Sequence, residues 1–253
     1  SGFALSGDGF TVIMDYYRDS EDGQAQADLN RLMDGTFSNQ EAGMPEGTVH
    51  SELLRRPGKL YVLASHFHPD HFNKEVLQWR EQRPDIIYIF SKDILRHRRA
   101  QKEDAVWLKK GEEYKDETLS VRAFGSTDVG VSFLLQTGGK KIFHAGDLNN
   151  WHWMDESTEA EWKGAEKNFL HELDDLYAYT PEVDVAMFPV DPRLGKEYMR
   201  GAGQFVTKIK THIFVPMHFT PEYAKANAFR DFAEAHGVRF VSLTHRGQKI
   251  EIE

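Results

Sequence analysis

The sequence predicts a mixed α/β (α+β) fold in which β-sheets pack against each other and helices cover them. Strand-like and helix-like segments alternate along the 253 residues, and turn sequences place hairpins near both ends of the chain. Because each sheet and each amphipathic helix must bury an apolar face, stacked layers satisfy all of them. Hydrophobic residues make up 40% of the chain, which is enough for the core of one domain over residues 1–253.

The N-terminal half is expected to alternate short strands with short helices. A hairpin turning at residues 7–9 is followed by a polar segment, 17–50, with a short helix expected near Leu29–Met33. The apolar run KLYVLASH, residues 59–66, predicts a buried strand. The same patterns predict helices at 74–82 and 93–100 and a strand at 85–91.

The C-terminal half is expected to contain a long helix, from about Glu156 to Tyr177. Four large apolar side chains fall on one face of this helix: Trp162, Phe169, Leu173 and Leu176. Gly138-Gly139 is a typical hairpin turn between two strands. The other expected elements are strands at 119–125, 131–137, 141–146, 183–190 and 212–219, helices at 196–209 and 221–237, and a hairpin over 238–253 that turns near Arg246-Gly247.

Composition disfavours several classes of protein. The chain carries 31 basic and 40 acidic residues, a net charge of -9 at pH 7, so a phosphate backbone is a disfavoured partner. The absence of cysteine excludes disulfide scaffolds, thiolate zinc sites and cysteine nucleophiles. Because no apolar stretch approaches the length of a membrane span and no signal peptide is recognisable, we expect a soluble, cytoplasmic protein.

The stretch SHFHPDHFN, residues 65–73, concentrates metal-binding side chains directly after a predicted buried strand. If that strand continues through His68, then His66 and His68 point to the same side and can bind one ion together. Asp70 and His71 follow a turn and can face a second ion. Imidazole and carboxylate groups together suit zinc, iron or manganese. The alternative is a chance surface cluster, but four such residues at this spacing favour a metal site.

One loop rarely closes a two-metal site, so further ligands are expected at other strand ends. Asp147 directly follows the strand at 141–146, and a carboxylate there can bridge two ions. His218 lies near the end of the apolar run 212–219. Asp15 ends the strand TVIMD, where it can orient a ligand imidazole without touching the ion.

Five segments occur in the order in which the metallo-β-lactamase superfamily presents its motifs: TVIMD, HFHPDH, GSTDVGVSFLL, FHAGD and PMHF. The sequence therefore resembles this superfamily, and the segment GQKIEI near the C-terminus also fits. The resemblance implies a four-layer αββα sandwich with a dinuclear site between two sheets. Members usually begin with one more strand than is visible here, so a few further native N-terminal residues are expected.

The resemblance also implies the ligands of each ion. Zn²⁺ is the expected cofactor, as one or two ions, with Mn²⁺ or Fe²⁺ as alternatives. Redox relatives carry a glutamate where His68 stands, which argues against an oxygen-reducing diiron site. The implied ligands are His66 and His68 for the first ion, Asp70, His71 and His218 for the second, and Asp147 as the bridge between them.

One ligand that the resemblance implies for the first ion is missing. Ser126 stands where a histidine is expected, and a neutral hydroxyl is a poor zinc ligand beside imidazole. Three outcomes stay open: only one ion binds well, Asp128 or a water held by Ser126 completes the shell, or another histidine reaches in. The candidate histidines are His144, His152 and His245, of which His152 is also a candidate acid or substrate contact.

A divalent ion lowers the pKa of bound water to about 7, which implies a hydrolase acting on a small ester, lactone or phosphoester. In this interpretation Asp147 positions the nucleophile, and Asp70 binds metal and accepts a proton. The segments FPVDPRLG and FVPMHF resemble the branch of ascorbate-6-phosphate lactonase-like hydrolases. That likeness places Asp191 and Arg193 at the pocket, where Arg193 either binds an anionic substrate group or stabilises the loop with Asp191.

Two other functions stay open. One is a phosphodiesterase or nuclease of the same superfamily, although the acidic charge counts against it. The other is a degenerate, non-catalytic protein that binds a single metal ion, an idea that Ser126 suggests. The expected partner is a small anionic molecule rather than nucleic acid or a membrane, and the sequence leaves homo-oligomer formation open.

Overall fold

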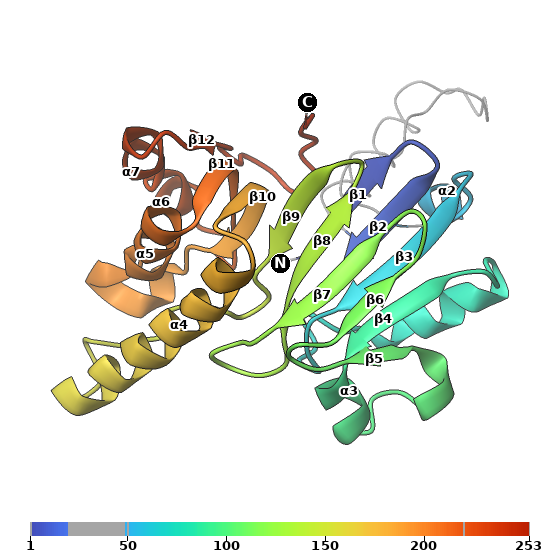
Figure 1. The fold of residues 1–253 in the computed structure, drawn as a ribbon, viewed down its shortest axis with the longest axis horizontal. Helices are drawn as coiled ribbons and strands as arrows, with labels where there is room; N and C mark the ends of the chain where they lie inside the picture. The colour runs from blue at the N-terminus through green and yellow to red at the C-terminus, as the bar shows by residue number, and fades with distance from the viewer. Residues whose placement is uncertain (1, 20–48, 50, 220, 253) are drawn as a thin grey trace, which may run out of the picture.

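The computed structural model describes residues 2–19, 49, 51–219 and 221–252. The helix expected near Leu29–Met33 and most of the polar segment 17–50 lie outside the described residues. Among the described residues the strands form two sheets with a shared core, and helices cover the outer face of each (Figure 1). This order of helix, sheet, sheet and helix confirms the predicted αββα fold.

The first sheet has the strand order β1-β2-β3-β4-β5. Its hairpin strands β1 and β2 are antiparallel, and the other neighbours are parallel. Alternate residues of β3 point to opposite faces: Tyr61 and Leu63 are buried between the sheets, whereas Leu60 and Val62 are buried beneath the helices. The strands are β1 (Phe3–Gly7), β2 (Phe10–Met14), β3 (Lys59–Ala64), β4 (Ile87–Ser91) and β5 (Val106–Leu108).

The second sheet has the order β12-β11-β10-β9-β8-β7-β6. It is parallel from β9 to β12 and antiparallel from β6 to β9. Gly138 and Gly139, with φ of 55° and 76°, form the predicted hairpin turn, because a tight turn of this type needs two positive φ angles. The strands are β6 (Glu113–Lys115), β7 (Ser120–Phe124), β8 (Ser132–Thr137), β9 (Lys140–His144), β10 (Glu182–Pro189), β11 (Lys210–Met217) and β12 (Arg239–Phe240).

The helices form the two outer layers, with α4 to α7 at one end of the molecule and α2 and α3 at the other (Figure 1). Phe169 of α4 and Phe205 of α5 contact Phe188 of β10, and all three side chains are fully buried. Next to the first sheet lie α2 (Ser51–Leu54), η1 (Lys74–Glu81), α3 (Lys92–Arg96) and η2 (Lys102–Asp104). The C-terminal half contains α4 (Glu159–Tyr179), η3 (Pro192–Glu197), α5 (Arg200–Lys208), α6 (Tyr223–Asn227) and α7 (Arg230–Ala235).

The long helix α4 follows the prediction closely. It begins three residues later than expected because Thr158 caps it: the Thr158 side chain accepts from the Glu161 N–H, and the Glu161 carboxylate accepts from the Thr158 N–H. Phe169, Leu173 and Leu176 of its expected apolar face are fully buried.

Two predicted helices differ from the observed ones. The helix expected at 74–82 forms over residues 74–81, with 3₁₀ geometry. The single helix expected over 221–237 is two short helices, α6 and α7, because the N–H of Phe229 bonds the Ala226 carbonyl three residues back and tightens the turn between them. Gly237, with φ of 75°, follows the end of α7 as expected.

The C-terminal hairpin predicted over 238–253 does not form within the described residues. Only β12 is a strand there, and it pairs in parallel with β11. Instead of a strand ladder, the side chain of Gln248 accepts from the Thr244 N–H at 3.0 Å and donates to the Ser242 carbonyl at 2.8 Å. Side-chain hydrogen bonds of this kind compete with sheet formation.

The carboxylate of Asp116 joins the two sheets. Its Oδ2 accepts hydrogen bonds from Lys59 Nζ at 2.9 Å and Tyr61 Oη at 2.8 Å, both on β3, and from Tyr114 Oη at 3.0 Å on β6. Its Oδ1 accepts from two backbone N–H groups of its own loop. Burial by itself would raise the pKa of Asp116, but these donors lower it well below its usual range.

Candidate metal centre

Six side chains meet at the C-terminal ends of β3, β9 and β11. They form two groups in which one nitrogen or oxygen atom of each residue lies within 4.8 Å of the others. The groups are His66, His68 and Asp147, and Asp70, His71 and His218.

Asp147 lies between the two groups. Its Oδ2 is 3.3 Å from His66 Nε2, on the side of the first group. Its Oδ1 is 3.2 Å from His71 Nε2 and 3.4 Å from His218 Nε2, on the side of the second group. Each oxygen therefore faces one group, which is the arrangement of a carboxylate that can bridge two ions.

Three atoms at this point are buried without a hydrogen-bond partner among the described residues: His66 Nε2, His71 Nε2 and Asp147 Oδ1. Buried polar atoms without partners are rare and unfavourable. Their spacing offers an explanation, because two ligand atoms about 2.0–2.2 Å from a tetrahedral zinc ion lie about 3.3–3.6 Å apart. The distances from Asp147 to the three imidazoles, 3.2–3.4 Å, fit that spacing better than they fit ordinary hydrogen bonds.

The strand ends turn sharply to bring these side chains together. Asp15 and His218 have positive φ angles of 50° and 64°, a conformation that is uncommon outside glycine. Gly146, with φ of 53°, precedes Asp147, and a Cβ there would lie 2.9 Å from the Cβ of Ser65. Glycine thus lets the end of β9 approach the end of β3.

The Nδ1 atoms of His66 and His71 are held by a buried hydrogen-bond network around Asp15. Asp15 Oδ2 lies 2.7 Å from His71 Nδ1, and Asp15 Oδ1 accepts the N–H of Ser65 at 2.7 Å. The Ser65 hydroxyl donates to Asp15 Oδ2 at 2.7 Å and lies 3.0 Å from His66 Nδ1. Since its one proton goes to Asp15, the hydroxyl accepts from His66 Nδ1–H, which leaves the Nε2 lone pair directed at Asp147.

His218 is held in the same way from the loop after β10. Its Nδ1 lies 2.8 Å from Asp191 Oδ2 and donates to this carboxylate, which can only accept. Arg193 Nε lies 3.0 Å from both oxygens of Asp191. Arg193 Nη2 is also 3.2 Å from His218 Nδ1, but a nitrogen that donates to Asp191 cannot accept from arginine as well. His66, His71 and His218 therefore all direct Nε2 toward Asp147.

The centre holds a strong excess of negative charge. Burial by itself would lower the pKa of His71, but the charge of Asp15 and the contacts with Asp147 and Asp70 raise it to about 11. Burial would raise the pKa of Asp147, yet the imidazoles of His66 and His71 lower it well below its usual range. Carboxylates that hold a proton this firmly on an imidazole also attract a metal cation in its place.

The residues of the centre fit a divalent metal ion on donor chemistry, spacing and support. Imidazole nitrogens and carboxylate oxygens are the donors that zinc, iron and manganese share. A hydrogen bond from the far nitrogen to a carboxylate, as His71 and His218 make, is typical of metal-binding histidine. These are the grounds on which we regard the cluster as a candidate metal centre.

Ser126 and Asp128 lie in the loop that connects β7 to β8. Ser126 Oγ is 3.4 Å from the N–H of Asp128. The carboxylate of Asp128 is 3.7 Å from His68 Nδ1, and the two side chains are 45% and 36% exposed. Asp128 is one of the residues that could replace the missing histidine, and it lies beside His68 of the first group.

The three other candidate histidines have different neighbours. His152 is buried, accepts from the Met154 N–H with Nδ1 and lies 3.1 Å from the Glu197 carbonyl with Nε2, so both nitrogens meet the backbone. His144 is buried with Nε2 3.7 Å from Asp15 Oδ2, behind the centre. His245 is exposed, with Nδ1 2.9 Å from Thr244 Oγ1.

Aromatic side chains pack beside the centre. Trp151 donates from Nε1 to the Asp147 carbonyl at 2.8 Å, and its ring packs edge-on against His218 at 5.5 Å. Trp153 stacks on Trp151. Ser65, by contrast, was not expected to contribute, because a serine at a strand end has no property that reveals a neighbour 50 residues away.

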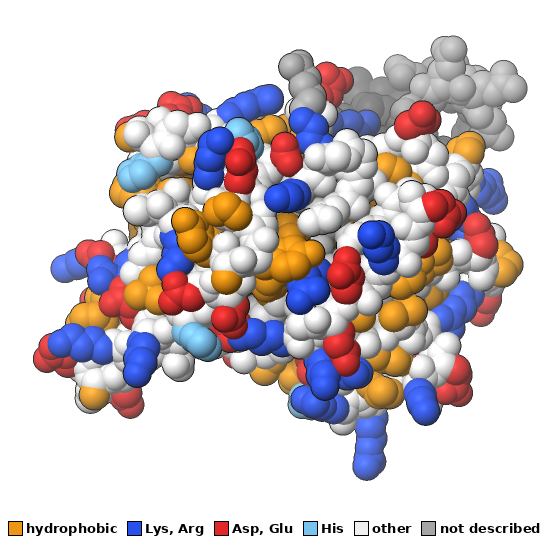
Figure 2. Space-filling model, in the orientation of Figure 1, with side chains coloured by type: hydrophobic (Ala, Val, Ile, Leu, Met, Phe, Trp, Pro, Cys, Tyr) orange, Lys and Arg blue, Asp and Glu red, His pale blue; other side chains and the backbone are white. Residues whose placement is uncertain are grey.

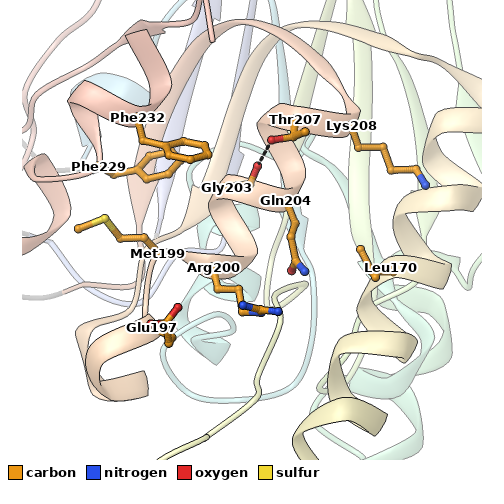
Figure 3. Close-up of a pocket in the computed structure, with 10 residues that line it drawn as sticks. All are labelled: Leu170, Glu197, Met199, Arg200, Gly203, Gln204, Thr207, Lys208, Phe229 and Phe232. Atoms are coloured by element: carbon orange, nitrogen blue, oxygen red, sulfur yellow. Dashed lines mark hydrogen bonds between the residues drawn. The ribbon is translucent and has the colours of Figure 1, made fainter. Parts of the chain in front are cut away.

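A separate groove of about 620 Å³ lies between α4, α5 and α7 (Figure 3). None of its lining residues belongs to the candidate metal centre. Figure 3 shows the rings of Phe229 and Phe232 on one side of the groove and Leu170 across from them. Glu197 and Arg200 line the same groove, together with Met199, Gly203, Gln204, Thr207 and Lys208.

The fold and the cluster at its strand ends define an αββα protein with a candidate metal centre. A family model described as a beta-lactamase superfamily domain matches residues 48–219, and the chain therefore belongs to that superfamily. No curated protein sequence matches the chain. Within the described residues, no helix is both long and apolar enough to cross a membrane.

Solved structures show the same fold at low sequence identity. Igni18, a metallo hydrolase of the hyperthermophilic archaeon Ignicoccus hospitalis, is 15% identical with a TM-score of 0.59, over 96% of this chain and 91% of that chain. The metallo-β-lactamase fold protein YhfI of Bacillus subtilis is 12% identical with a TM-score of 0.56, over 98% and 89%. The short form of human tRNase Z is 13% identical with a TM-score of 0.51, over 100% and 92%.

Proposed function

We propose that the protein is a metal-dependent hydrolase of a small ester, lactone or phosphoester. The observation that carries this proposal is the convergence of three histidine Nε2 atoms on Asp147, with buried atoms that lack hydrogen-bond partners among the described residues. Membership of a superfamily whose members are mostly metal-dependent hydrolases supports it. We further propose a single domain over residues 1–253 and a cytoplasmic location.

The proposed ligands follow the two groups. His66, His68 and Asp147 hold one ion, and Asp70, His71, His218 and Asp147 hold the other. Zn²⁺ suits a set rich in imidazole, and Mn²⁺ or Fe²⁺ suits it as well. A bound divalent ion lowers the pKa of water to about 7 and polarises the substrate oxygen.

Asp147 and Asp70 have different roles in the proposed reaction. Asp147 is 5% exposed and fixed among the imidazoles, so it positions the groups around the attacking water. The Asp70 side chain is 56% exposed, so it can reach both water and substrate. In the proposed reaction the water oxygen forms a bond to the acyl carbon or phosphorus while Asp70 accepts a proton from that water. The bond to the leaving oxygen then breaks, and Asp70 returns the proton to the leaving oxygen.

An anionic substrate is favoured by Arg193. One edge of its guanidinium, Nε and Nη2, is paired with Asp191, and this pairing raises the pKa of Arg193. The described hydrogen bonds do not use Nη1, and the side chain is 63% exposed beside His218. Arginine can therefore stabilise the loop and still offer donors to a carboxylate or phosphate. The lactonase-like interpretation rests on this loop and stays a prediction.

Two other functions each have an observation in their favour. The structural similarity of this chain to human tRNase Z supports a nuclease as an alternative function. Against it stand the net charge of -9 and the interspersed acidic and basic side chains on the face shown in Figure 2. Ser126 favours a non-catalytic protein with one ion, but six ligand-type side chains remain clustered.

Metal analysis combined with a substrate panel tests the proposal. The purified protein, His66→Ala, His218→Ala and the control His236→Ala, an exposed histidine after α7, are compared for bound metal and for turnover of lactone, ester and phosphodiester substrates. We expect the first two variants to lose metal and turnover together, and the control to keep both. Turnover that survives both active-site substitutions would contradict the proposed function.

A further inference from the structure

We propose that Asp128 is a ligand of the first ion, in place of the histidine that Ser126 replaces. This inference rests on the proposed function, because it concerns the same centre. The first group supplies only His66, His68 and Asp147, whereas the second has a carboxylate of its own in Asp70. A further anionic ligand on the first ion would complete four protein ligands.

The loop that carries Asp128 is anchored beside His66. The N–H of Val131 donates to the Ser65 carbonyl at 3.0 Å. Gly130, with φ of 75°, lies so close that a Cβ there would be 2.5 Å from the Cβ of His66. Only glycine allows this approach, so the C-terminal side of the loop is fixed next to one ligand of the first group.

The other side of the same loop is anchored beside Asp147. Thr127 Oγ1 donates to the Asn149 carbonyl at 2.5 Å and accepts the N–H of Asn149 at 3.0 Å. Asn149 lies two residues beyond Asp147 in the chain. Asp128 and Val129 lie between the two anchors, and the carboxylate of Asp128 meets the first group at His68.

The contacts of Asp128 and Ser126 agree with this role. Asp128 Oδ2 is 3.7 Å from His68 Nδ1, which is long for a hydrogen bond and near the spacing of two ligands on one tetrahedral ion. Ser126 Oγ meets the N–H of Asp128 at 3.4 Å, so the serine contacts the backbone of the proposed ligand. His66 Nε2, fully buried and without a hydrogen-bond partner among the described residues, belongs to the same group.

The alternative is an exposed Asp128–His68 ion pair, which would contribute little to stability or to metal binding. The two interpretations differ in the number and affinity of bound ions. Four proteins separate them: wild type, Asp128→Ala, the double variant Ser126→His with Asp128→Ala, and the control Asp231→Ala on the exposed surface of α7. Each is loaded with zinc, dialysed, and analysed for metal content and by calorimetric titration.

We expect two ions per chain in wild type and control, and one in Asp128→Ala. The first ion should bind Asp128→Ala more weakly by over 100-fold, beyond the roughly 10–100-fold that loss of a group hydrogen-bonded to a ligand causes. The double variant should regain the first ion and with it two ions per chain, because a histidine then stands at position 126. Circular dichroism of Asp128→Ala should match wild type, since the side chain is 45% exposed and outside the core.

Two ions bound to Asp128→Ala with unchanged affinity would overturn the inference and leave the proposed hydrolase intact. One ion bound to wild type, with no change on removing Asp128, would overturn it as well. A wild-type protein that binds no ion would contradict the proposed function itself and this inference with it.

Discussion

Asp15 Oδ2 lies 2.7 Å from Nδ1 of His71, although the two residues are 56 positions apart in the chain. Asp15 directly follows β2 and has a positive φ of 50°, and its carboxylate contacts Ser65 and His71 in the segment that follows β3. It is fully buried, and although burial by itself would raise the pKa of Asp15, the charges of His144 and His71 lower it. The contact fixes the ring of His71 with Nε2 toward Asp147.

The first prediction concerns this contact. Asp15→Asn keeps the side-chain shape, and asparagine tolerates the positive φ, but it removes the charge that orients His71. We expect zinc to bind the second group about 10–100-fold more weakly, as measured by competition with a chromophoric chelator. Asp8→Asn, in the exposed β1–β2 turn, serves as the control. Equal zinc affinity in Asp15→Asn and the control would show that the buried carboxylate does not support the ligand.

The second prediction concerns the carboxylate that joins the sheets. Asp116→Asn should lower the free energy of unfolding by about 1–3 kcal/mol at pH 7, because hydrogen bonds to a charged group are lost or weakened. The measurement is urea unfolding of wild type and variant at a series of pH values.

The sign of the pH dependence follows from the pKa of Asp116, which folding lowers. Its contribution is complete above the unfolded pKa of about 4 and is lost as the pH falls below that value toward the folded pKa. Burial and Asp116 raise the pKa of Tyr114 to about 12, so the Tyr114 contribution is lost as the pH rises from about 10 toward that value. The gap between wild type and Asp116→Asn should therefore be widest between these limits. A gap that is the same at pH 3 and pH 7 would contradict the prediction.

The third prediction uses a matched pair of glycines. Gly146→Ala places a Cβ 2.9 Å from the Ser65 Cβ at a φ of 53°, so we expect a loss of about 1–3 kcal/mol in unfolding free energy and weaker zinc binding. Gly164 lies inside α4, where a Cβ meets nothing within 4 Å. Gly164→Ala should raise stability by about 0.5–1 kcal/mol. Thermal unfolding and metal titration check both, and equal effects of the two substitutions would be incompatible with the close approach of β9 and β3.

The fourth prediction concerns substrate charge. Arg193→Gln removes a cation beside His218, so the KM of an anionic ester such as mono-(4-nitrophenyl) succinate should rise about 10–100-fold, and that of neutral 4-nitrophenyl butyrate should change little. Metal content is measured alongside, because Arg193 also contacts Asp191. Arg230→Gln, remote at the start of α7, is the control. An equal rise in KM for both esters would mean that Arg193 acts through the loop rather than on the substrate.

Most of the fold was predictable from the sequence because the apolar pattern of each strand lies within a few consecutive residues. The run 59–66 and the Gly138-Gly139 turn need no knowledge of distant residues. The prediction of a C-terminal hairpin was wrong because the side chain of Gln248 forms hydrogen bonds with backbone groups of this segment. The apolar pattern of a strand contains no sign of such side-chain bonds. The prediction of one helix over 221–237 was wrong because a 3₁₀-type hydrogen bond at Phe229 divides the segment into two helices.

The candidate centre was predictable where its residues lie close together in the chain or follow a strand. Asp147 and His218 follow apolar runs, so their position at the C-terminal edge could be inferred. The hydroxyl of Ser65 and the anchoring of the loop around Asp128 could not, because they depend on contacts between segments far apart in the chain. Nothing in the spacing of those residues announces such contacts.

The most direct measurement is anomalous diffraction from a crystal of the protein soaked with zinc or manganese, recorded at the absorption edge of the metal. We predict one peak among His66, His68 and Asp147 and a second among Asp70, His71, His218 and Asp147. A map without a peak in the space between these histidines and Asp147 would contradict the metal centre on which the proposed function depends.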